Sequence, residues 1–382
     1  MKNIYKIIFL IICLSSALVQ CTNEPRLSGS FQSIDFGEVT KESNIFVDIL
    51  QYTQLQTTEQ SLIGEVSQLE MSKDKIFILD RKTNSFFVFH KNGLLDKKIS
   101  ADPGPGGFVA PRTFWIDSEG HILILDVNLN KILKYTSDKI QFVEAINIGE
   151  LNWSSPISFG IIPKENTYAH YFLHNEKNQI DNKQIGLTKD NEKLEKLYLE
   201  ANSTGTIMFG SPRNFYVLND ELNFYPYFSN KIYAITSDSL KLRYELLFNN
   251  LNFPPESVFI ENPGTRQFMT TISEKNYVQY MTVFETQETL YINYLIKYEK
   301  YVAIYNKNSK KVKNLKVQDI TDELGLGNSF LEPISVYENC FIGLINPDNI
   351  DSIKLEEQGF KSNLGVFKDD DNPILVFYKL KE

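Results

Sequence analysis

The stretch LEMSKDKIFILDRKTNSFFVF at residues 69–89 recurs as WIDSEGHILILDVNLNKILKY at residues 115–135, at an offset of 46 residues and without gaps. The apolar runs IFILD and FFVF of the first copy fall on ILILD and ILKY of the second. Runs of four or five β-branched and aromatic residues, bounded by Asn, Asp, Gly and Lys, favour strands over helices. The repeat therefore predicts a unit of two short strands joined by a polar loop.

Further copies of this unit can be traced to the end of the chain. PRTFWI at 111–116 returns as PRNFYV at 212–217, and the gap between them leaves room for a degenerate copy around Tyr168–Leu187. Two more copies use residues 289–305 and 340–380. Units of about 45 to 55 residues with about four strands each are typical of β-propeller blades. The spacing predicts an all-β fold, a six-bladed β-propeller with about four antiparallel strands per blade.

Two strand-like runs near the N-terminus are left over from this repeat, SIDFG at 33–37 and NIFVDIL at 44–50. We expect both to pair with the last blade. Such pairing closes the ring and removes exposed sheet edges, which are otherwise sites of aggregation.

The order of KIFILD at 75–80, DPGPGGF at 102–108 and FWIDSEGHILILD at 114–126 resembles that of the six-bladed β-propeller lipoproteins of Gram-negative bacteria, relatives of NHL-repeat propellers. The segments LLFNNLNFPP at 246–255 and NPILVFYKLK at 372–381 strengthen the resemblance, which covers essentially the whole mature chain. It implies the same fold. In that family the crossing loop typically ends Gly-Pro-Gly-Glu-aromatic, whereas Gly107 stands here at the acidic position.

The N-terminus has the features of an export signal. Lys2 and Lys6 precede an apolar run of twelve residues, Ile7–Leu18, which is shorter than the roughly 20 residues that span a bilayer. The following LVQC resembles a lipobox, although Gln20 replaces the usual small residue before Cys21. We expect a lipoprotein signal peptide and lipidation of Cys21, with a plain cleaved signal peptide as the alternative.

Three parts of the chain follow from these patterns. Residues 1–20 are predicted to be the signal peptide, residues 21–29 a flexible tether, and residues 30–382 a single propeller domain. We expect the mature protein to be held by its lipid in the cell envelope, in the outer membrane, facing the periplasm or the surface.

Cysteine content and charge narrow the possible partners. After export and lipidation only Cys340 remains, within the apolar run CFIGLI, so we expect a buried, unreactive thiol. The formal charge of −9 becomes −11 when residues 1–20 leave. A chain this acidic has no electrostatic footprint for nucleic acid. No basic run suggests a polybasic membrane patch.

The glycine-rich stretch ADPGPGGFVAP at 101–111 could cradle an anion or only turn the chain. A phosphate loop follows a strand and opens a helix, but the residues after this stretch, RTFWID, form a predicted strand. Pro103 and Pro105 also remove two backbone donors. We expect a connector between blades.

Two patterns suggest metal sites weakly. His170 and His174 have helical ligand spacing, but TYAHYFL is a predicted strand, in which four residues span roughly 13 Å. The run Asp369–Asp371 lacks the alternating spacing of a calcium loop, and a solvated turn is expected.

Asp80 and Asp126 end equivalent strands, and we expect both to cap the following loop. No metal and no cofactor is predicted.

Arg112 and Arg213 each follow a proline at the start of an innermost strand, near the mouth of the central channel. Forked hydrogen bonds from two such arginines could hold an anionic or carbohydrate ligand, with Arg81 as a third candidate. The alternative is that each pairs with an acidic residue of the adjacent blade.

The sequence favours a binding function. We expect a β-propeller of the cell envelope that is anchored to the membrane through a lipid on Cys21 and binds a protein or glycan partner. The alternative is a propeller enzyme of lyase, hydrolase or dehydrogenase type at the channel mouth. That alternative needs a convergent set of His, Asp, Glu or Tyr side chains with perturbed pKa values at the mouth. A structure that places Arg112, Arg213 and two acids around one pocket would favour it, and a mouth filled by Phe and Leu would contradict it.

Overall fold

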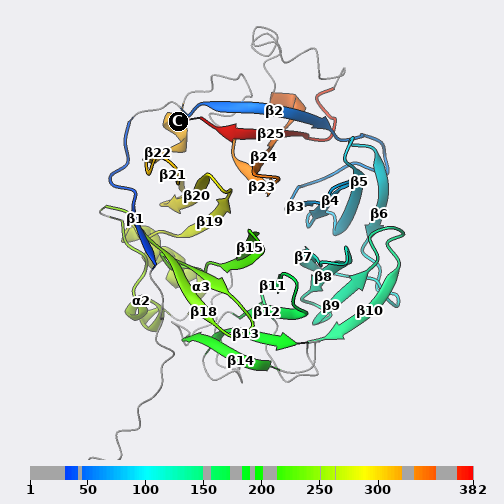
Figure 1. Ribbon diagram of the computed structural model, residues 1–382, viewed down its shortest axis with the longest axis horizontal. Helices are drawn as coiled ribbons and strands as arrows, with labels where there is room; N and C mark the ends of the chain where they lie inside the picture. Colours follow the sequence, from blue (N-terminus) through cyan, green and yellow to red (C-terminus); the bar gives the residue numbers. More distant parts are fainter. Residues whose placement is uncertain are drawn as a thin grey trace, which may run out of the picture. The chain divides into compact units, whose positions relative to one another are not determined.

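A ring of six antiparallel sheets, each with four blade strands, makes up the described part of the chain (Figure 1). The computed structural model describes residues 31–41, 45–148, 156–172, 183–189, 194–200, 213–249, 251–262, 264–320, 331–349 and 368–381. Phe31–Glu382 form one compact unit. The predicted six-bladed β-propeller is confirmed. The signal peptide, Cys21 and the tether lie outside the described residues.

The blades follow one another along the chain. Blade 1 contains β3 (Gln68–Met71), β4 (Lys75–Asp80), β5 (Ser85–His90) and β6 (Leu95–Ser100). Blade 2 contains β7 (Pro111–Ile116), β8 (Ile122–Asp126), β9 (Lys131–Tyr135) and β10 (Phe142–Asn147). Blade 3 contains β11 (Ser158–Ile162), β12 (Thr167–Tyr171), β13 (Lys183–Lys189) and β14 (Leu194–Glu200). Blade 4 contains β15 (Phe215–Leu218), β16 (Glu221–Phe224), β17 (Lys231–Ile235) and β18 (Leu240–Leu247).

The last two blades complete the ring. Blade 5 contains β19 (Tyr280–Glu285), β20 (Thr289–Ile296), β21 (Glu299–Asn306) and β22 (Val312–Lys316). Blade 6 contains β23 (Pro333–Tyr337), β24 (Cys340–Ile345), β25 (Ile374–Leu380) and, from the N-terminal segment, β2 (Val47–Gln54). The first strand of each blade, β3, β7, β11, β15, β19 and β23, lies nearest the central channel (Figure 1).

The N-terminal segment crosses the outer edges of three blades. β1 (Gln32–Asp35) pairs in parallel with β18 as a fifth strand of blade 4, Thr40 bridges to Leu315 of blade 5, and β2 pairs antiparallel with β25 of blade 6. The expectation that SIDFG joins the last blade is therefore wrong. Phe36 explains this position, because its ring is buried and stacks on Phe248 just beyond β18, with centroids 5.2 Å apart.

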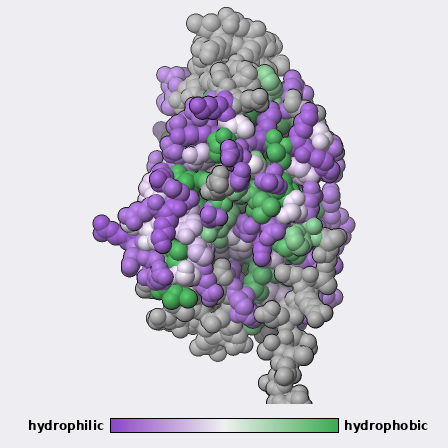
Figure 2. Space-filling view, turned by 90° about the vertical axis from the view of Figure 1, so that its left-hand side faces the viewer, coloured by the Kyte–Doolittle hydropathy of each residue, from purple (hydrophilic) through white to green (hydrophobic). Residues whose placement is uncertain are grey.

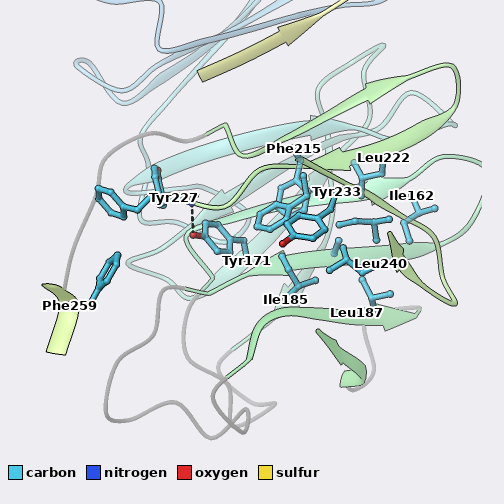
Figure 3. Packing of buried hydrophobic residues seen from close by; sticks show 14 of the residues in the cluster. Ile162, Tyr171, Ile185, Leu187, Phe215, Leu222, Tyr227, Tyr233, Leu240 and Phe259 are labelled. Atoms are coloured by element: carbon cyan, nitrogen blue, oxygen red, sulfur yellow. Dashed lines mark hydrogen bonds between the residues drawn. The ribbon is translucent and has the colours of Figure 1, made fainter. Parts of the chain in front are cut away.

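The core lies between neighbouring blades, and therefore both faces of the middle strands are buried. Figure 3 shows the contact between blades 3 and 4, where Ile185 of β13 packs in one cluster with Phe215 of β15 and Leu222 of β16. The hydroxyl of Tyr171 accepts a hydrogen bond from the backbone N–H of Tyr227 at 3.0 Å. Aromatic residues thus serve inter-blade packing, which is the role that large apolar side chains commonly have.

Two short helices follow blade 4, α2 (Glu256–Glu261) and α3 (Thr265–Glu274). Phe259 and Phe268 of this pair lie edge-on to Phe228, with centroids 5.7 and 5.0 Å apart. Two 3-10 turns, η2 (Val317–Asp319) and η3 (Pro347–Asn349), complete the helical elements among the described residues. None of the described helices is long and apolar enough to cross a membrane. Hydrophilic residues cover most of the side of the ring seen in Figure 2, with small apolar groups among them.

The glycine-rich stretch joins β6 to β7 and turns the chain, as expected. Asp102 N donates to the carbonyl oxygen of Phe108 at 2.9 Å, and Gly107 N donates to that of Gly104 at 3.0 Å. A Cβ atom on Gly107 would lie 2.0 Å from the carbonyl oxygen of Asp102. The glutamate typical of the related loops therefore cannot stand at this position without a change of backbone.

Asp80 and Asp126 cap the loops after their strands, as expected, and each also binds the loop before its blade. Asp126 Oδ1 accepts from the N–H groups of Asn128 and Leu129, both at 2.9 Å, and Oδ2 accepts from those of Val109 and Ala110. Each side chain is fully buried. The two aspartates thus fasten successive connections of the ring.

The expectation of a buried thiol at Cys340 is not met, whereas the solvated turn expected at Asp369–Asp371 is confirmed. Cys340 is only half-buried, because it begins β24 directly after a turn, so the expectation of a core thiol is wrong. Burial nevertheless raises the pKa of its thiol. The run Asp369–Asp371 forms an exposed turn, closed by the Asp371 N–H donating to the Lys368 carbonyl oxygen at 3.0 Å.

Candidate functional site

A cavity of about 420 Å³ lies where the six innermost strands end, and we call it the mouth cavity. Each blade contributes to it through the last residues of its first strand or the turn that follows. Its lining comprises Glu70, Met71, Trp115, Ile116, Asp117, Ser118, Ile161, Ile162, Pro163, Lys164, Arg213, Tyr216, Val217, Asp220, Phe284, Glu285 and Val336. Its volume is within the usual range of small-molecule sites.

Arg213 crosses the channel beneath this cavity. Its backbone precedes β15 in blade 4, while its Nη1 atom lies 3.1 Å from Oε1 of Glu70 in blade 1, which is the opposite blade in a ring of six. The side chains of Arg213 and Glu70 are 13% and 26% exposed. This partly buried ion pair forms a polar floor that remains accessible from the cavity.

Two further contacts hold the arginine side chain in the channel. The guanidinium lies over the ring of Phe284, 5.4 Å from its centroid, and Nη1 is 3.5 Å from the carbonyl oxygen of Ile334. The hydroxyl of Tyr225 donates to the carbonyl oxygen of Arg213 and fixes its backbone. Blades 1, 4, 5 and 6 therefore meet at one guanidinium.

A second cavity of about 270 Å³, the side cavity, lies toward the end of the channel where the innermost strands begin. Arg213 and Phe284 line both cavities, and they stand between the two spaces. The remaining lining residues of the side cavity are Ser67, Gln68, Tyr280, Thr282, Asn293, Tyr294, Leu295, Lys300, Glu332, Pro333 and Ile334.

The walls of the mouth cavity are apolar and aromatic, and its rim is charged. Trp115, Tyr216 and Phe284 come from blades 2, 4 and 5, respectively. At the rim Lys164 of blade 3 forms an ion pair with Asp220 of blade 4. The cavity thus combines a large apolar surface with a few polar groups, as ligand sites commonly do.

One wall contains the carboxylate of Glu285, whose side chain is fully buried. It lies 3.0 Å from Nη2 of Arg243 and 2.6 Å from Nζ of Lys307, and it accepts from the hydroxyls of Tyr216 and Tyr244 at 2.6 and 3.0 Å. Burial and this carboxylate raise the pKa of Tyr216 well above its ordinary value. Burial lowers the pKa of Lys307, with Glu285 opposing the shift.

Both oxygens of the Glu285 carboxylate have partners within the protein. Arg243, Lys307 and Tyr244 contact Oε1 of this carboxylate, and Tyr216 donates to Oε2. Arg112 and Arg213 with two acids around one pocket would have favoured the enzyme alternative. Arg213, Glu70 and Glu285 do line the mouth cavity, but Arg112 does not.

Arg112 and Arg81, the other two predicted arginines, lie toward the end of the channel where the innermost strands begin, away from the mouth cavity. Arg112 is the second residue of β7, and Arg81 follows β4. Burial lowers the pKa of Arg112, and the guanidinium of Arg81 lowers it further, whereas Tyr227 raises it. Neither Arg81 nor Arg112 lines the mouth cavity or the side cavity. Arg213 also begins its blade at this end, but of the three arginines it alone lines the mouth cavity and the side cavity.

One group among the described residues has the ligand atoms for a metal ion. Asp117, Glu119 and His121 bring such atoms within 4.8 Å of one another. Their contacts are already satisfied in part, because Asp117 Oδ1 accepts from the N–H groups of Glu119 and His121, and Asp117 Oδ2 lies 3.7 Å from Nζ of Lys134.

Of the two histidines with ligand spacing in the sequence, His170 alone lies in the described part of the chain. His170 lies in β12 with its ring 2% exposed, and its Nε2 is 2.9 Å from Oγ1 of Thr188. Burial lowers its pKa to about 3. The expectation of an ordinary strand residue is confirmed for His170, while His174 lies outside the described residues.

Sequence reasoning missed Glu70, Trp115 and Glu285. A signal for the first two was present, because both stand at or near the end of the first strand of a repeat, just before its turn. In a propeller those positions surround the channel. Glu285 also ends the first strand of its blade, but the copy traced in the sequence begins only at residue 289, and the role of Glu285 depends on Arg243 of β18 and Lys307 just after β21.

Comparisons with known proteins agree with this architecture. The structure is similar to that of a Bacteroides fragilis NCTC 9343 protein classed as exported, with a TM-score of 0.78, 18% identity, and 92% of this chain and 100% of that chain covered. It is also similar to a DUF4221 family member from Bacteroides vulgatus ATCC 8482, with a TM-score of 0.56, 11% identity, and 90% and 99% covered. No curated protein matches the sequence. The model of the family described as 6-bladed beta-propeller (DUF5128) matches residues 23–344, and the chain belongs to this family.

Proposed function

We propose that this protein is a binding module of the bacterial cell envelope, anchored through a lipid on Cys21, that receives part of a protein or glycan partner in the mouth cavity. The observation that carries the proposal is the Arg213–Glu70 ion pair, which places a donor fork and a carboxylate at the floor of an aromatic cavity. Similarity to a protein classed as exported supports an envelope location.

Export and anchoring rest on the N-terminal sequence. A charged start, a short apolar run and LVQC at 18–21 fit a lipoprotein that is cleaved before Cys21. One acyl chain gives marginal membrane binding, so stable anchoring needs more than one. The diacyl group and N-terminal acyl chain of a bacterial lipoprotein would meet this need. We expect the anchored propeller to face the periplasm or the surface.

In-situ crosslinking of the tagged protein in its native envelope, followed by mass spectrometry, tests the proposal. A partner recovered with the wild type, reduced with Arg213→Gln and lost with Cys21→Ser, is the expected result. Undiminished recovery of the same partner with Arg213→Gln would show that the mouth cavity is not the binding site. Recovery of the propeller alone from the wild type would contradict the binding role.

A further inference from the structure

The charged groups that line the mouth cavity are paired within the protein. Glu70 pairs with Arg213 at 3.1 Å, and Asp220 pairs with Lys164. The buried carboxylate of Glu285 has two cationic neighbours at 3.0 Å or less. A singly charged ligand would have to separate such a pair and leave one member partly buried without its counter-charge, which is unfavourable.

The carboxylate of Asp117 at the rim also has partners within the protein. Its Oδ2 atom lies 3.0 Å from Nδ1 of His121 and 3.7 Å from Nζ of Lys134. The cavity therefore does not demand a net charge from its ligand, although six charged side chains line it.

The floor offers a strong donor and a strong acceptor side by side. The guanidinium of Arg213 donates in a fixed fork, and the carboxylate of Glu70 accepts through several lone pairs. Two neighbouring hydroxyls of a ligand can accept from the first and donate to the second while the ion pair stays intact. A ligand with a single polar group would use only one half of this floor.

The walls require an apolar face on the same ligand. Trp115, Tyr216 and Phe284 line the cavity from three blades, and the electron-rich faces of aromatic rings attract weakly positive C–H groups. The hydrogen bond of the Tyr216 hydroxyl to Glu285 holds that ring in place. A pyranose ring carries both features, since hydroxyls surround it while its axial C–H groups form an apolar patch.

We infer that the ligand class of the mouth cavity is a neutral sugar residue, free or at the end of a glycan, held by its diol on Arg213 and Glu70. The inference rests on the proposed function, because it names the ligand of that same cavity. Acidic sugars, amino sugars and zwitterionic peptides are the competing classes.

Fluorescence of Trp115 gives a readout inside the cavity. The sequence has two tryptophans, so Trp153→Phe in the mature chain leaves Trp115 as the single reporter. The probes are the methyl glycosides and short oligomers of glucose, galactose, mannose and N-acetylglucosamine, compared with galacturonic acid, glucosamine and the dipeptide Gly-Phe. We expect saturable change with at least one neutral sugar, and an apparent Kd that differs less than about twofold between low and high salt.

Matched variants assign the binding to the floor. Glu70→Gln and Arg213→Gln should each weaken the neutral sugar about tenfold or more, whereas Lys300→Gln, which lines the side cavity only, should leave its Kd unchanged. The wild-type panel keeps the test valid if a variant does not fold.

Two results would overturn the inference. Saturation by a charged or zwitterionic probe, with none by neutral sugars, would assign another ligand class and leave the binding function standing. No saturable response to any neutral sugar would reject the sugar class outright. The crosslinking experiment does not depend on ligand class, so failure of the binding function would be recognised separately.

Discussion

The guanidinium of Arg213 in blade 4 contacts the carboxylate of Glu70 in blade 1, with 3.1 Å between Nη1 and Oε1, across the central channel. The two residues lie 143 positions apart in the sequence. This pair joins opposite sides of the ring at the floor of the mouth cavity. It therefore links the stability of the ring with the chemistry of the candidate site.

A double-mutant cycle measures the pair directly. Glu70→Gln and Arg213→Gln should each destabilise the fold, and their coupling energy should be about 1–2 kcal/mol, between the values for exposed and for buried pairs. Urea unfolding of the four proteins checks this. Additive effects of the two changes would mean that the contact contributes nothing in solution.

Asp126 is expected to be a main support of the connection between blades 1 and 2. Asp126→Ala removes the acceptor of four backbone N–H groups, and we expect a loss of about 2–4 kcal/mol. Asp126→Asn should fall between, because one acceptor oxygen remains. Thermal melts provide the measurement, with the exposed Asp138→Ala melting as the wild type does; equal melting of Asp126→Ala would disprove this role.

The N-terminal segment should stabilise the ring from outside. Phe36→Ala removes a buried ring stacked on Phe248, and we expect a loss of about 3 kcal/mol. Phe31→Ala is the matched control, since that ring is 47% exposed and its loss should cost less than about 0.5 kcal/mol. Denaturant midpoints of both variants decide, and similar midpoints would place β1 outside the stable core.

His170 should make the protein less stable in mild acid. Its folded pKa of about 3 lies below the ordinary 6.5, because burial disfavours the charged ring. Between these two pKa values the unfolded chain binds a proton at His170 and the folded chain does not. The contribution of His170 to the free energy of unfolding is therefore fully present above pH 6.5 and is lost as the pH falls toward 3. By pH 5 this group should cost about 2 kcal/mol. Parallel pH profiles of unfolding for the wild type and His170→Gln would refute the assignment.

The sequence predicted the ring because the first two blades repeat the same pattern of apolar and turn residues without gaps, and the buried runs Ile76–Asp80 and Ile122–Asp126 lie in their second strands. It did not predict the place of β1. Two leftover strands with similar composition could close the same blade, and the stacking of Phe36 on Phe248, which decides between them, cannot be read from spacing.

The candidate site was predictable only in part. The proline-arginine motif correctly placed Arg213 at the channel. Its partner was expected in the adjacent blade, but Glu70 belongs to the opposite one, because a long side chain in a narrow channel reaches across the axis. Such a contact depends on channel width, which a linear pattern does not contain.

The mouth cavity is proposed to be where the protein meets its partner, and we would test this proposal first by site-specific photocrosslinking in the native envelope. A photoreactive residue at Val217, which lines the cavity and is 42% exposed, is compared with one at Val312 on β22, which is 38% exposed. We expect a discrete adduct from position 217 and none from position 312. Equal adducts from both positions, or an adduct from position 312 alone, would contradict it.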